Sequence, residues 1–331
     1  MIKEQRHSNG VSTSSHALRR VVVTDCVGFP APGSIEQEEL GADYEVVVVD
    51  ASTEEEVIAT ARLEPVGLFV NMAPITKKVL QSLPTLRAVV RYGVGIDNVD
   101  CAEASVLGIA AMNVPDYCTD EVAQHAASMV MARARRLAEF DMALKGGAWG
   151  PDIVTAPVPV GEDTVGLLGF GNIGRRAAQI LRSIGFPVVA YDPYIPEEPF
   201  LSAGVQRALS LAELASRARH LSLHVPATET TVGMVDRGVL EELGPEGHLV
   251  NTARGAVVDE AALLAALDDG AIAWASLDVW RTEPAVGLTA QLVAHRRVTA
   301  TPHIAYLSTK SQGRLRHLAA SRLKAALEAD R

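Results

Sequence analysis

The sequence lacks several features that mark specialised classes of protein. No run of about 20 apolar residues is present that could cross a membrane, and residues 1–20 lack the apolar core of a signal peptide. Only three cysteines occur, at positions 26, 101 and 118, without the spacing of a metal site. We therefore expect no membrane anchor, no disulfide scaffold, no bound metal and a reducing, cytoplasmic environment.

The sequence is also poor in positive charge. Lys and Arg number 30 against 40 Asp and Glu, which gives a formal net charge of -10. Because affinity for nucleic acid depends largely on Lys and Arg, we do not expect a nucleic-acid-binding protein. With 331 residues, of which 48% are hydrophobic, the chain can instead form about two globular domains.

Short β-branched runs alternate with helix-like stretches, a pattern typical of parallel sheets covered by helices. Strands are predicted in the first half at Val21–Asp25, Tyr44–Asp50, Gly67–Asn71, Arg87–Arg91 and Ile109–Asn113. Strands are predicted in the second half at Thr164–Leu168, Pro187–Tyr191, His220–Leu223, His248–Asn251, Trp274–Asp278 and Arg297–Ala300. Between the halves, residues 119–145 are predicted to form one long helix, with Thr119 as its cap and arginines toward its end.

A glycine-rich turn follows the first strand of the second half. It consists of Gly169, Phe170, Gly171, Asn172, Ile173 and Gly174, and so has the spacing G-x-G-x-x-G between a strand and a helix. Such a turn lets the backbone approach a pyrophosphate, which the free N–H groups of the helix then bind. Asp192 ends the next strand, where a carboxylate would bind ribose hydroxyls and repel a 2′-phosphate. We therefore predict NAD rather than NADP; the alternative is a structural turn with a surface aspartate.

Three polar residues follow later strands, at the sheet edge where ligands bind in such folds. Arg254 has the guanidinium that would hold a carboxylate and polarise a ketone. His303 could donate the proton that meets the developing alkoxide, and Glu283 could orient that histidine. Each residue alone also has a structural interpretation, as an ion pair, a turn or a core histidine. Together they predict hydride transfer to a 2-oxo acid.

These motifs resemble those of the D-isomer-specific 2-hydroxyacid dehydrogenase family, and within it the C-terminal-binding-protein-like and phosphoglycerate-dehydrogenase-like branches. The resemblance spans roughly residues 20–328. It implies a catalytic set of Arg254, Glu283 and His303. It further implies two doubly wound parallel-sheet domains with a cleft between them, one flavodoxin-like and one of the Rossmann type. The expected boundaries are a disordered segment at 1–18, a substrate domain at 19–117 plus 301–331 and a dinucleotide-binding domain at 118–300. A homodimer interface is implied at residues 119–145.

The substrate is expected to be a small anion. Arg91 and the turn at Tyr92, Gly93 and Val94 can form a nest for a carboxylate, phosphonate or phosphate, although Arg91 could instead pair with Asp97. Tyr306 and Met72 are further candidates for the substrate site, and Tyr306 could equally serve in packing. The resemblance disfavours phosphoglycerate, because phosphoglycerate dehydrogenases usually carry basic residues near the segment after Trp149, whereas residues 146–173 contain no Lys or Arg. The remaining residues predicted at the cofactor site are Val225, Pro226, Thr230, Thr252, Ala253 and Asp278.

Three functions fit these observations. The first is NAD-dependent interconversion of a small 2-oxo acid and its 2-hydroxy acid. The second is an NADH-responsive dimeric scaffold like the co-repressor relatives of the family, which would bind dinucleotide without turnover. The third is a dehydrogenase of a phosphonate analogue, because the proposed anion nest does not distinguish a phosphonate from a carboxylate.

Overall fold

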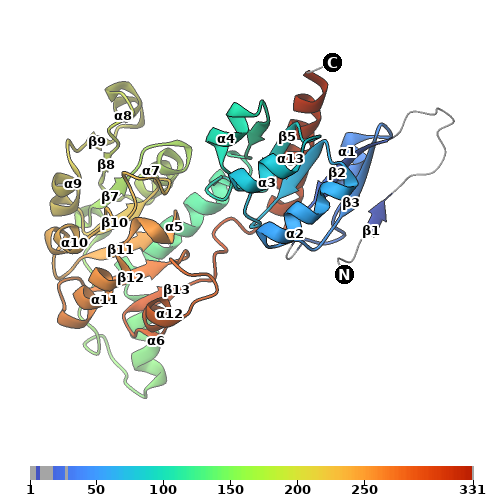
Figure 1. The fold of residues 1–331 in the computed structure, drawn as a ribbon. Helices are drawn as coiled ribbons and strands as arrows, with labels where there is room; N and C mark the ends of the chain where they lie inside the picture. The colour runs from blue at the N-terminus through green and yellow to red at the C-terminus, as the bar shows by residue number, and fades with distance from the viewer. Residues whose placement is uncertain (1–4, 8–17, 27–28, 330–331) are drawn as a thin grey trace. The chain divides into compact units, whose positions relative to one another are not determined.

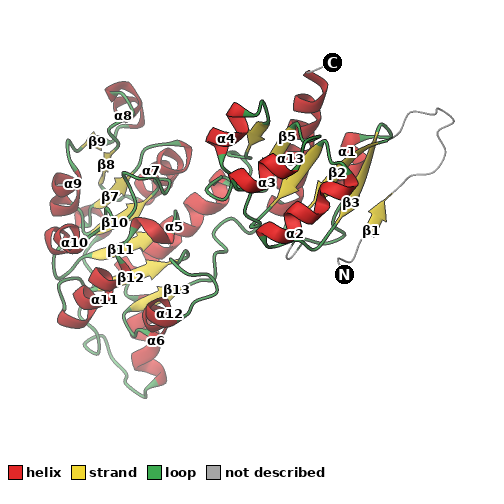
Figure 2. Cartoon of the chain, in the orientation of Figure 1, coloured by secondary structure: helices red, strands yellow, loops and turns green. Residues whose placement is uncertain are grey.

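The chain folds into two units in the computed structural model, which describes residues 5–7, 18–26 and 29–329. The first unit contains the chain up to Cys118 and again from Ser308, and the second contains Thr119–Leu307. Each unit has a central sheet with helices on both faces (Figures 1 and 2). The predicted fold class of two doubly wound, parallel-sheet units is confirmed.

The first unit has the strand order β1-β3-β2-β4-β5-β6. Strands β2 to β6 are parallel and follow the flavodoxin-like order. Helices α2, α3 and α4 bury apolar side chains against one face of the sheet, and α1 and α13 pack together on the other. The elements are β1 (Gln5–His7), β2 (Arg19–Val23), α1 (Ser34–Leu40), β3 (Tyr44–Val48), α2 (Glu54–Ile58), η1 (Ala59–Leu63), β4 (Gly67–Val70), α3 (Lys77–Ser82), β5 (Ala88–Arg91), α4 (Cys101–Val106), β6 (Ala110–Met112) and α13 (Ser311–Ala329).

The second unit has the strand order β13-β12-β11-β10-β7-β8-β9, and all seven strands are parallel. The chain changes direction across the sheet between β7 and β10, which is the switch point of a Rossmann fold. The elements are α5 (Thr119–Ala134), α6 (Leu137–Lys145), η2 (Val160–Glu162), β7 (Val165–Leu168), α7 (Asn172–Ile184), β8 (Val188–Tyr191), α8 (Glu197–Ala203), β9 (Gln206–Arg207), α9 (Leu211–Arg217), β10 (His220–Leu223), α10 (Arg237–Leu243), β11 (His248–Asn251), η3 (Gly255–Val257), α11 (Glu260–Asp269), β12 (Trp274–Leu277), α12 (Gly287–Ala294) and β13 (Val298–Ala300).

The secondary structure differs from the sequence prediction at three places. The long helix predicted at 119–145 is two helices, α5 and α6, because Arg136 has a left-handed backbone with φ 52°. The guanidinium of Arg136 stabilises this break by donating to Glu139 and Glu246. Most of the segment predicted to be disordered, 1–18, lies outside the described residues, but Gln5–His7 pair with β3 as an antiparallel edge strand. The two-residue strand β9 is also not predicted.

The last segment before α13 belongs to a different unit from the one expected. The sequence places 301–331 in the substrate domain, whereas the contacts of the structure assign residues up to Leu307 to the second unit. The reason is a set of hydrogen bonds from this segment to Asp278, which follows β12. The donors include the backbone N–H groups of Ile304 and Ala305.

No helix among residues 5–7, 18–26 and 29–329 is long and apolar enough to cross a membrane.

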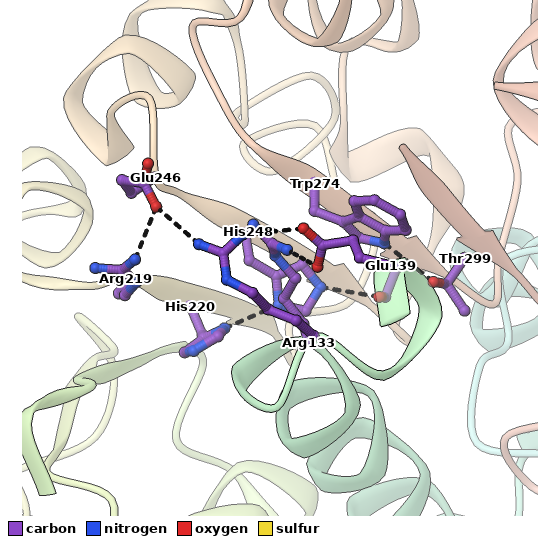
Figure 3. Close-up of polar contacts among 10 residues, drawn as sticks. Arg133, Glu139, Arg219, His220, Glu246, His248, Trp274 and Thr299 are labelled. Carbon is purple, nitrogen blue, oxygen red and sulfur yellow. Dashed lines mark hydrogen bonds and ion pairs between the residues drawn. The ribbon is translucent and has the colours of Figure 1, made fainter. Parts of the chain in front are cut away.

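A buried polar network crosses the amino edge of the second sheet. His220 and His248 begin neighbouring strands, and their Nδ1 atoms are 2.9 Å apart (Figure 3). His220 Nε2 lies 3.0 Å from Asp163, and His248 Nε2 lies 2.9 Å from the hydroxyl of Ser276. Arg133 packs over the ring of Trp274 beside them. Each ring nitrogen of the two histidines therefore has a hydrogen-bond partner.

This network predicts a loss of stability in acid. Burial, followed by the charges of His220 and Arg133, lowers the pKa of His248 well below 6.5. Below about pH 6.5 the unfolded chain therefore binds a proton that the folded chain excludes, so the free energy of unfolding falls as the pH falls. Urea denaturation between pH 7.5 and 5 should show this loss, and His248→Gln, which does not titrate, should show a smaller one. Equal pH dependence of the two proteins would contradict the assignment.

Candidate active site

The glycine-rich turn lies at the switch point of the second unit, after β7. Gly169 has φ +96°, and a Cβ there would lie 2.6 Å from the carbonyl oxygen of His224, which follows β10. A Cβ on Gly174 would lie 2.3 Å from the carbonyl oxygen of Gly169. Gly171, in contrast, faces open space and caps α7 without a side-chain hydrogen bond. The N–H groups of the first turn of α7 are therefore available to an anion such as a pyrophosphate.

Asp192 lies directly beside this turn. Its Oδ2 accepts a hydrogen bond from Phe170 N at 2.9 Å, and its Oδ1 accepts one from Tyr194 N at 3.0 Å. A carboxylate has further lone pairs on both oxygens, which fits the binding of two ribose hydroxyls. Phe170 contributes only its backbone here, because its ring is buried and stacks on Phe200 at 4.4 Å.

Two further loops complete this edge of the sheet. Val225 packs against Gly169, and Pro226 begins a loop that Thr231 stabilises, since the Thr231 hydroxyl donates to Pro226 O and accepts from Thr228 N. The predicted Thr230 is exposed and bonds only to Thr228 among the described residues. After β11, the hydroxyl of Thr252 is buried with no hydrogen-bond partner in the described part of the chain. An open glycine, a helix terminus that can bind an anion, the carboxylate of Asp192 beside the turn and the buried hydroxyl of Thr252 together fit NAD.

The three predicted catalytic residues follow β11, β12 and β13, on one edge of the second sheet. His303 Nδ1 lies 2.8 Å from Glu283 Oε2, and Trp280 N donates to Glu283 Oε1 at 2.9 Å. Arg254 is close enough that its charge affects the carboxyl of Glu283. The segments that carry these residues pack tightly, because a Cβ on Gly255 would lie 2.0 Å from the carbonyl carbon of Trp280. The structure thus brings Arg254, Glu283 and His303 together.

The electrostatics favour an ionised Glu283. Burial by itself raises the pKa of this carboxyl, but the hydrogen bond and charge of His303, the N–H of Trp280 and the charge of Arg254 outweigh burial. The net pKa of Glu283 therefore lies below its ordinary value. Because Glu283 holds Nδ1 of His303, Nε2 is the ring nitrogen that can give a proton to a ligand. The edge of the Tyr306 ring packs against the same imidazole, with centroids 6.4 Å apart.

Asp278, which is predicted at the cofactor site, also holds the segment around His303. Its side chain is fully buried. Oδ1 accepts from Thr301 Oγ1 and Ile304 N, and Oδ2 accepts from Ala305 N. The side chain of Asn251, which follows β11, similarly bonds the loop of Arg254 through Ala253 N and Arg254 O. Both Asp278 and Asn251 follow a strand. From the sequence alone, this position is equally compatible with binding a ligand and with holding a neighbouring loop.

The first unit brings together three of the predicted substrate residues. The side chain of Arg91 lies over Gly93, its Nε donates to Asn71 O at 3.1 Å, and its Nη2 lies 3.8 Å from Met72 Sδ. The buried carboxylate of Asp25, which the sequence analysis misses, holds this loop by accepting from the N–H groups of residues 71–73.

Tyr92 is not available as predicted. Its side chain is 2% exposed, and its hydroxyl donates to Glu36 in the core of the first unit. Its backbone N–H donates to Val70 O at 2.7 Å, so this N–H does not take part in the predicted anion nest. The neighbouring Val94 uses its carbonyl oxygen to accept from Asn113.

Comparison with known proteins agrees with this geometry. The family model described as "D-isomer specific 2-hydroxyacid dehydrogenase, NAD binding domain" matches residues 127–305, more than half of the chain. D-3-phosphoglycerate dehydrogenase of Mycobacterium bovis is 34% identical over 275 residues, which are 83% of this chain and 51% of that protein. The chain thus spans about half the length of the curated relatives it matches.

Solved structures with known ligands are also similar. The NADPH-dependent glyoxylate/hydroxypyruvate reductase of Sinorhizobium meliloti, in complex with NADP and malonate, is 30% identical with a TM-score of 0.80 over 94% of both chains. D-lactate dehydrogenase of Aquifex aeolicus, with NAD and lactic acid, is 26% identical with a TM-score of 0.82 over 94% of this chain and 96% of that one. With the matched domain and the Arg254, Glu283 and His303 cluster in place, the chain belongs to the D-isomer-specific 2-hydroxyacid dehydrogenase family.

Proposed function

We propose that this protein is an NAD-dependent D-2-hydroxyacid dehydrogenase that interconverts a small 2-oxo acid and its D-2-hydroxy acid. The observation that carries the proposal is the hydrogen-bonded pair of His303 and Glu283, 2.8 Å apart, with the charge of Arg254 beside it. NADH, bound by the glycine-rich turn and Asp192, would supply the hydride.

Each catalytic residue has one task in this proposal. The guanidinium of Arg254 binds the substrate carboxylate and polarises the carbonyl. The protonated imidazole of His303 donates the Nε2 proton to the carbonyl oxygen as negative charge develops there. Glu283 fixes the orientation of the ring through Nδ1 and stabilises its protonated form. In the direction of oxidation, neutral His303 accepts the proton of the substrate hydroxyl.

We propose that the substrate anion is bound by Arg91 and by the backbone of Gly93 and Val94, with Met72 and Tyr306 as further contacts. The relatives named above act on phosphoglycerate, lactate and glyoxylate or hydroxypyruvate, so the substrate belongs to the same class of short acids. The absence of Lys and Arg from residues 146–173 favours an unphosphorylated acid.

A substrate panel tests the proposal. NADH absorbance at 340 nm is followed with glyoxylate, pyruvate, hydroxypyruvate, phosphohydroxypyruvate and a phosphonate aldehyde. Turnover of at least one 2-oxo acid is expected. Reduction of the phosphonate alone would support a phosphonate dehydrogenase. Tight NADH binding without turnover of any member would favour the dimeric scaffold.

Asp192 should determine the choice of dinucleotide. Its carboxylate lies beside the turn and would repel the 2′-phosphate of NADPH, so Asp192→Ala should lower the ratio of kcat/KM for NADH to that for NADPH by about tenfold or more. The exposed Asp236, which caps α10 through Val239 N, offers a matched control as Asp236→Asn. An unchanged ratio in Asp192→Ala would remove this role from Asp192.

We also propose that the protein is a homodimer that associates through residues 119–145. Helix α6 has no buried residue, and Leu137, Met142 and Leu144 are each at least half exposed. Such a group of exposed apolar side chains is typical of an interface, and the sedimentation coefficient would reveal the dimer.

We further propose that the protein works in a reducing, cytoplasmic environment. The free thiols of Cys26 and Cys101 support this proposal.

A further inference from the structure

The backbone of His303 is in an unfavourable conformation. Its φ is 55°, in the left-handed region that residues with a side chain rarely adopt. Such a conformation persists only where the surroundings hold it, and it is common at catalytic positions. The contacts that hold His303 therefore determine where its imidazole lies.

Besides Glu283, which bonds the imidazole, Asp278 makes several of the contacts that hold this segment. Its carbonyl oxygen accepts from His303 N at 2.7 Å, and its carboxylate binds Thr301 on one side of His303 and Ile304 and Ala305 on the other. A carboxylate with no exposed surface is costly unless hydrogen bonds and a positive charge compensate it. Within the part of the chain that the structure describes, the one basic side chain within 4 Å of it is His125, at 3.9 Å.

His125 also has a defined hydrogen-bonding role. Its Nε2 lies 3.2 Å from Thr301 Oγ1. Because that hydroxyl gives its single hydrogen to Asp278, its oxygen can only accept, and the imidazole must donate from Nε2. The hydrogen bonds therefore run in one direction, from His125 through Thr301 to the carboxylate that holds His303.

We propose that His125, on helix α5, is a positioning residue for the reaction. It orients Thr301 and Asp278, and these hold the segment of residues 301–305 in which His303 has its left-handed backbone. His125 does not contact the substrate in this proposal. It affects the reaction by fixing the position of the His303 imidazole. The expected effect of His125 on turnover rests on the proposed function. The expected effect on the stability of segment 301–305 does not depend on that function.

Turnover of variants provides the first test. His125→Ala should lower kcat by about 10- to 100-fold, because a small displacement of the proton donor is sufficient for such a loss, while the dissociation constant of NADH stays unchanged. His125→Gln places an amide donor near the position of Nε2 and should restore most of kcat. Thr301→Val breaks the same chain of hydrogen bonds with little change of shape and should match His125→Ala.

A matched control distinguishes positioning from general disruption of the helix. Ser128 lies on the same helix and, with His125, Trp274 and Thr301, lines a cavity of about 210 Å³. Among the residues that the structure describes, its hydroxyl bonds only within the helix, to Gln124 O, so Ser128→Ala should retain wild-type kcat. If Ser128→Ala lost as much activity as His125→Ala, or if Gln at 125 gave no recovery, the positioning role would be wrong.

Hydrogen exchange tests the inference independently of turnover. The amides of Ile304 and Ala305 donate to Asp278, so His125→Ala and Thr301→Val should speed their exchange, while His125→Gln and Ser128→Ala should not. Unchanged exchange in both His125→Ala and Thr301→Val would overturn the inference. If the wild-type protein reduced no 2-oxo acid, the proposed function would fail, and exchange would still decide the role of His125.

Discussion

His303→Ala is expected to reduce kcat for NADH-dependent reduction by about 10²- to 10⁴-fold, the usual contribution of a positioned general acid. The imidazole is held by Glu283 at Nδ1, so its loss removes the proton donor at the developing alkoxide. The glycine-rich turn and Asp192 remain intact, so the dissociation constant of NADH should not change. Stopped-flow or steady-state absorbance at 340 nm measures the first quantity, and NADH fluorescence titration measures the second.

A second histidine provides the control for this experiment. His317, on α13, forms the same kind of pair, with Nδ1 2.7 Å from Glu39 Oε1, but on the exposed surface of the first unit. His317→Ala removes an equivalent His–Glu contact and should leave kcat unchanged. A kcat of His303→Ala close to that of the wild type would contradict the assigned proton donor.

The largest effect on stability is expected at Arg316. Its guanidinium donates to both oxygens of Glu36, at 2.8 and 2.6 Å, and to the carbonyl oxygens of Pro30 and Ala31. Both side chains of the pair are at most 2% exposed. Burial by itself raises the pKa of Glu36, but the hydrogen bond and charge of Arg316 outweigh it and keep the pKa below its ordinary value. The pair is therefore a buried, fully bonded ion pair that joins α1 to α13.

Arg316→Met should lower the free energy of unfolding by about 3–5 kcal/mol, because it leaves the Glu36 carboxylate buried without its counter-charge. Urea denaturation measures this change. Lys78→Met, which removes the exposed ion pair to Glu54 in the same unit, should lower the free energy of unfolding far less, because exposed ion pairs contribute little to stability. Equal costs for the two substitutions would show that Glu36 is neutral in the folded protein.

The sequence predicts the candidate site well where a residue with a reactive side chain directly follows a predicted strand. Arg254, Glu283 and His303 each follow a strand, and parallel strands present their carboxyl ends at one edge. The motifs that resemble those of the family therefore predict both the fold and the residues that the structure brings together. The Rossmann turn is equally predictable, because Gly169 and Gly174 are required by contacts that any side chain would break.

The sequence is less informative where a side chain has two possible partners. Tyr92 lies within a glycine-flanked motif, yet Glu36, 56 residues away, holds its hydroxyl in the core. Asp278 follows a strand, as a ligand-binding acid would, and its carboxylate also binds the segment after β13. The break between α5 and α6 depends on ion pairs of Arg136 with Glu139 and with the distant Glu246. The contacts to Glu36 and Glu246 join residues far apart in the sequence, so local spacing does not predict them.

The most direct test of hydride transfer follows a labelled hydrogen. NADH that carries deuterium at both C4 positions is incubated with the best 2-oxo acid, and the hydroxy acid product is examined by mass spectrometry and chiral chromatography. The proposed function predicts the D-isomer with one deuterium at C2. A hydroxy acid without deuterium, or NADH consumption without any hydroxy acid, would contradict it.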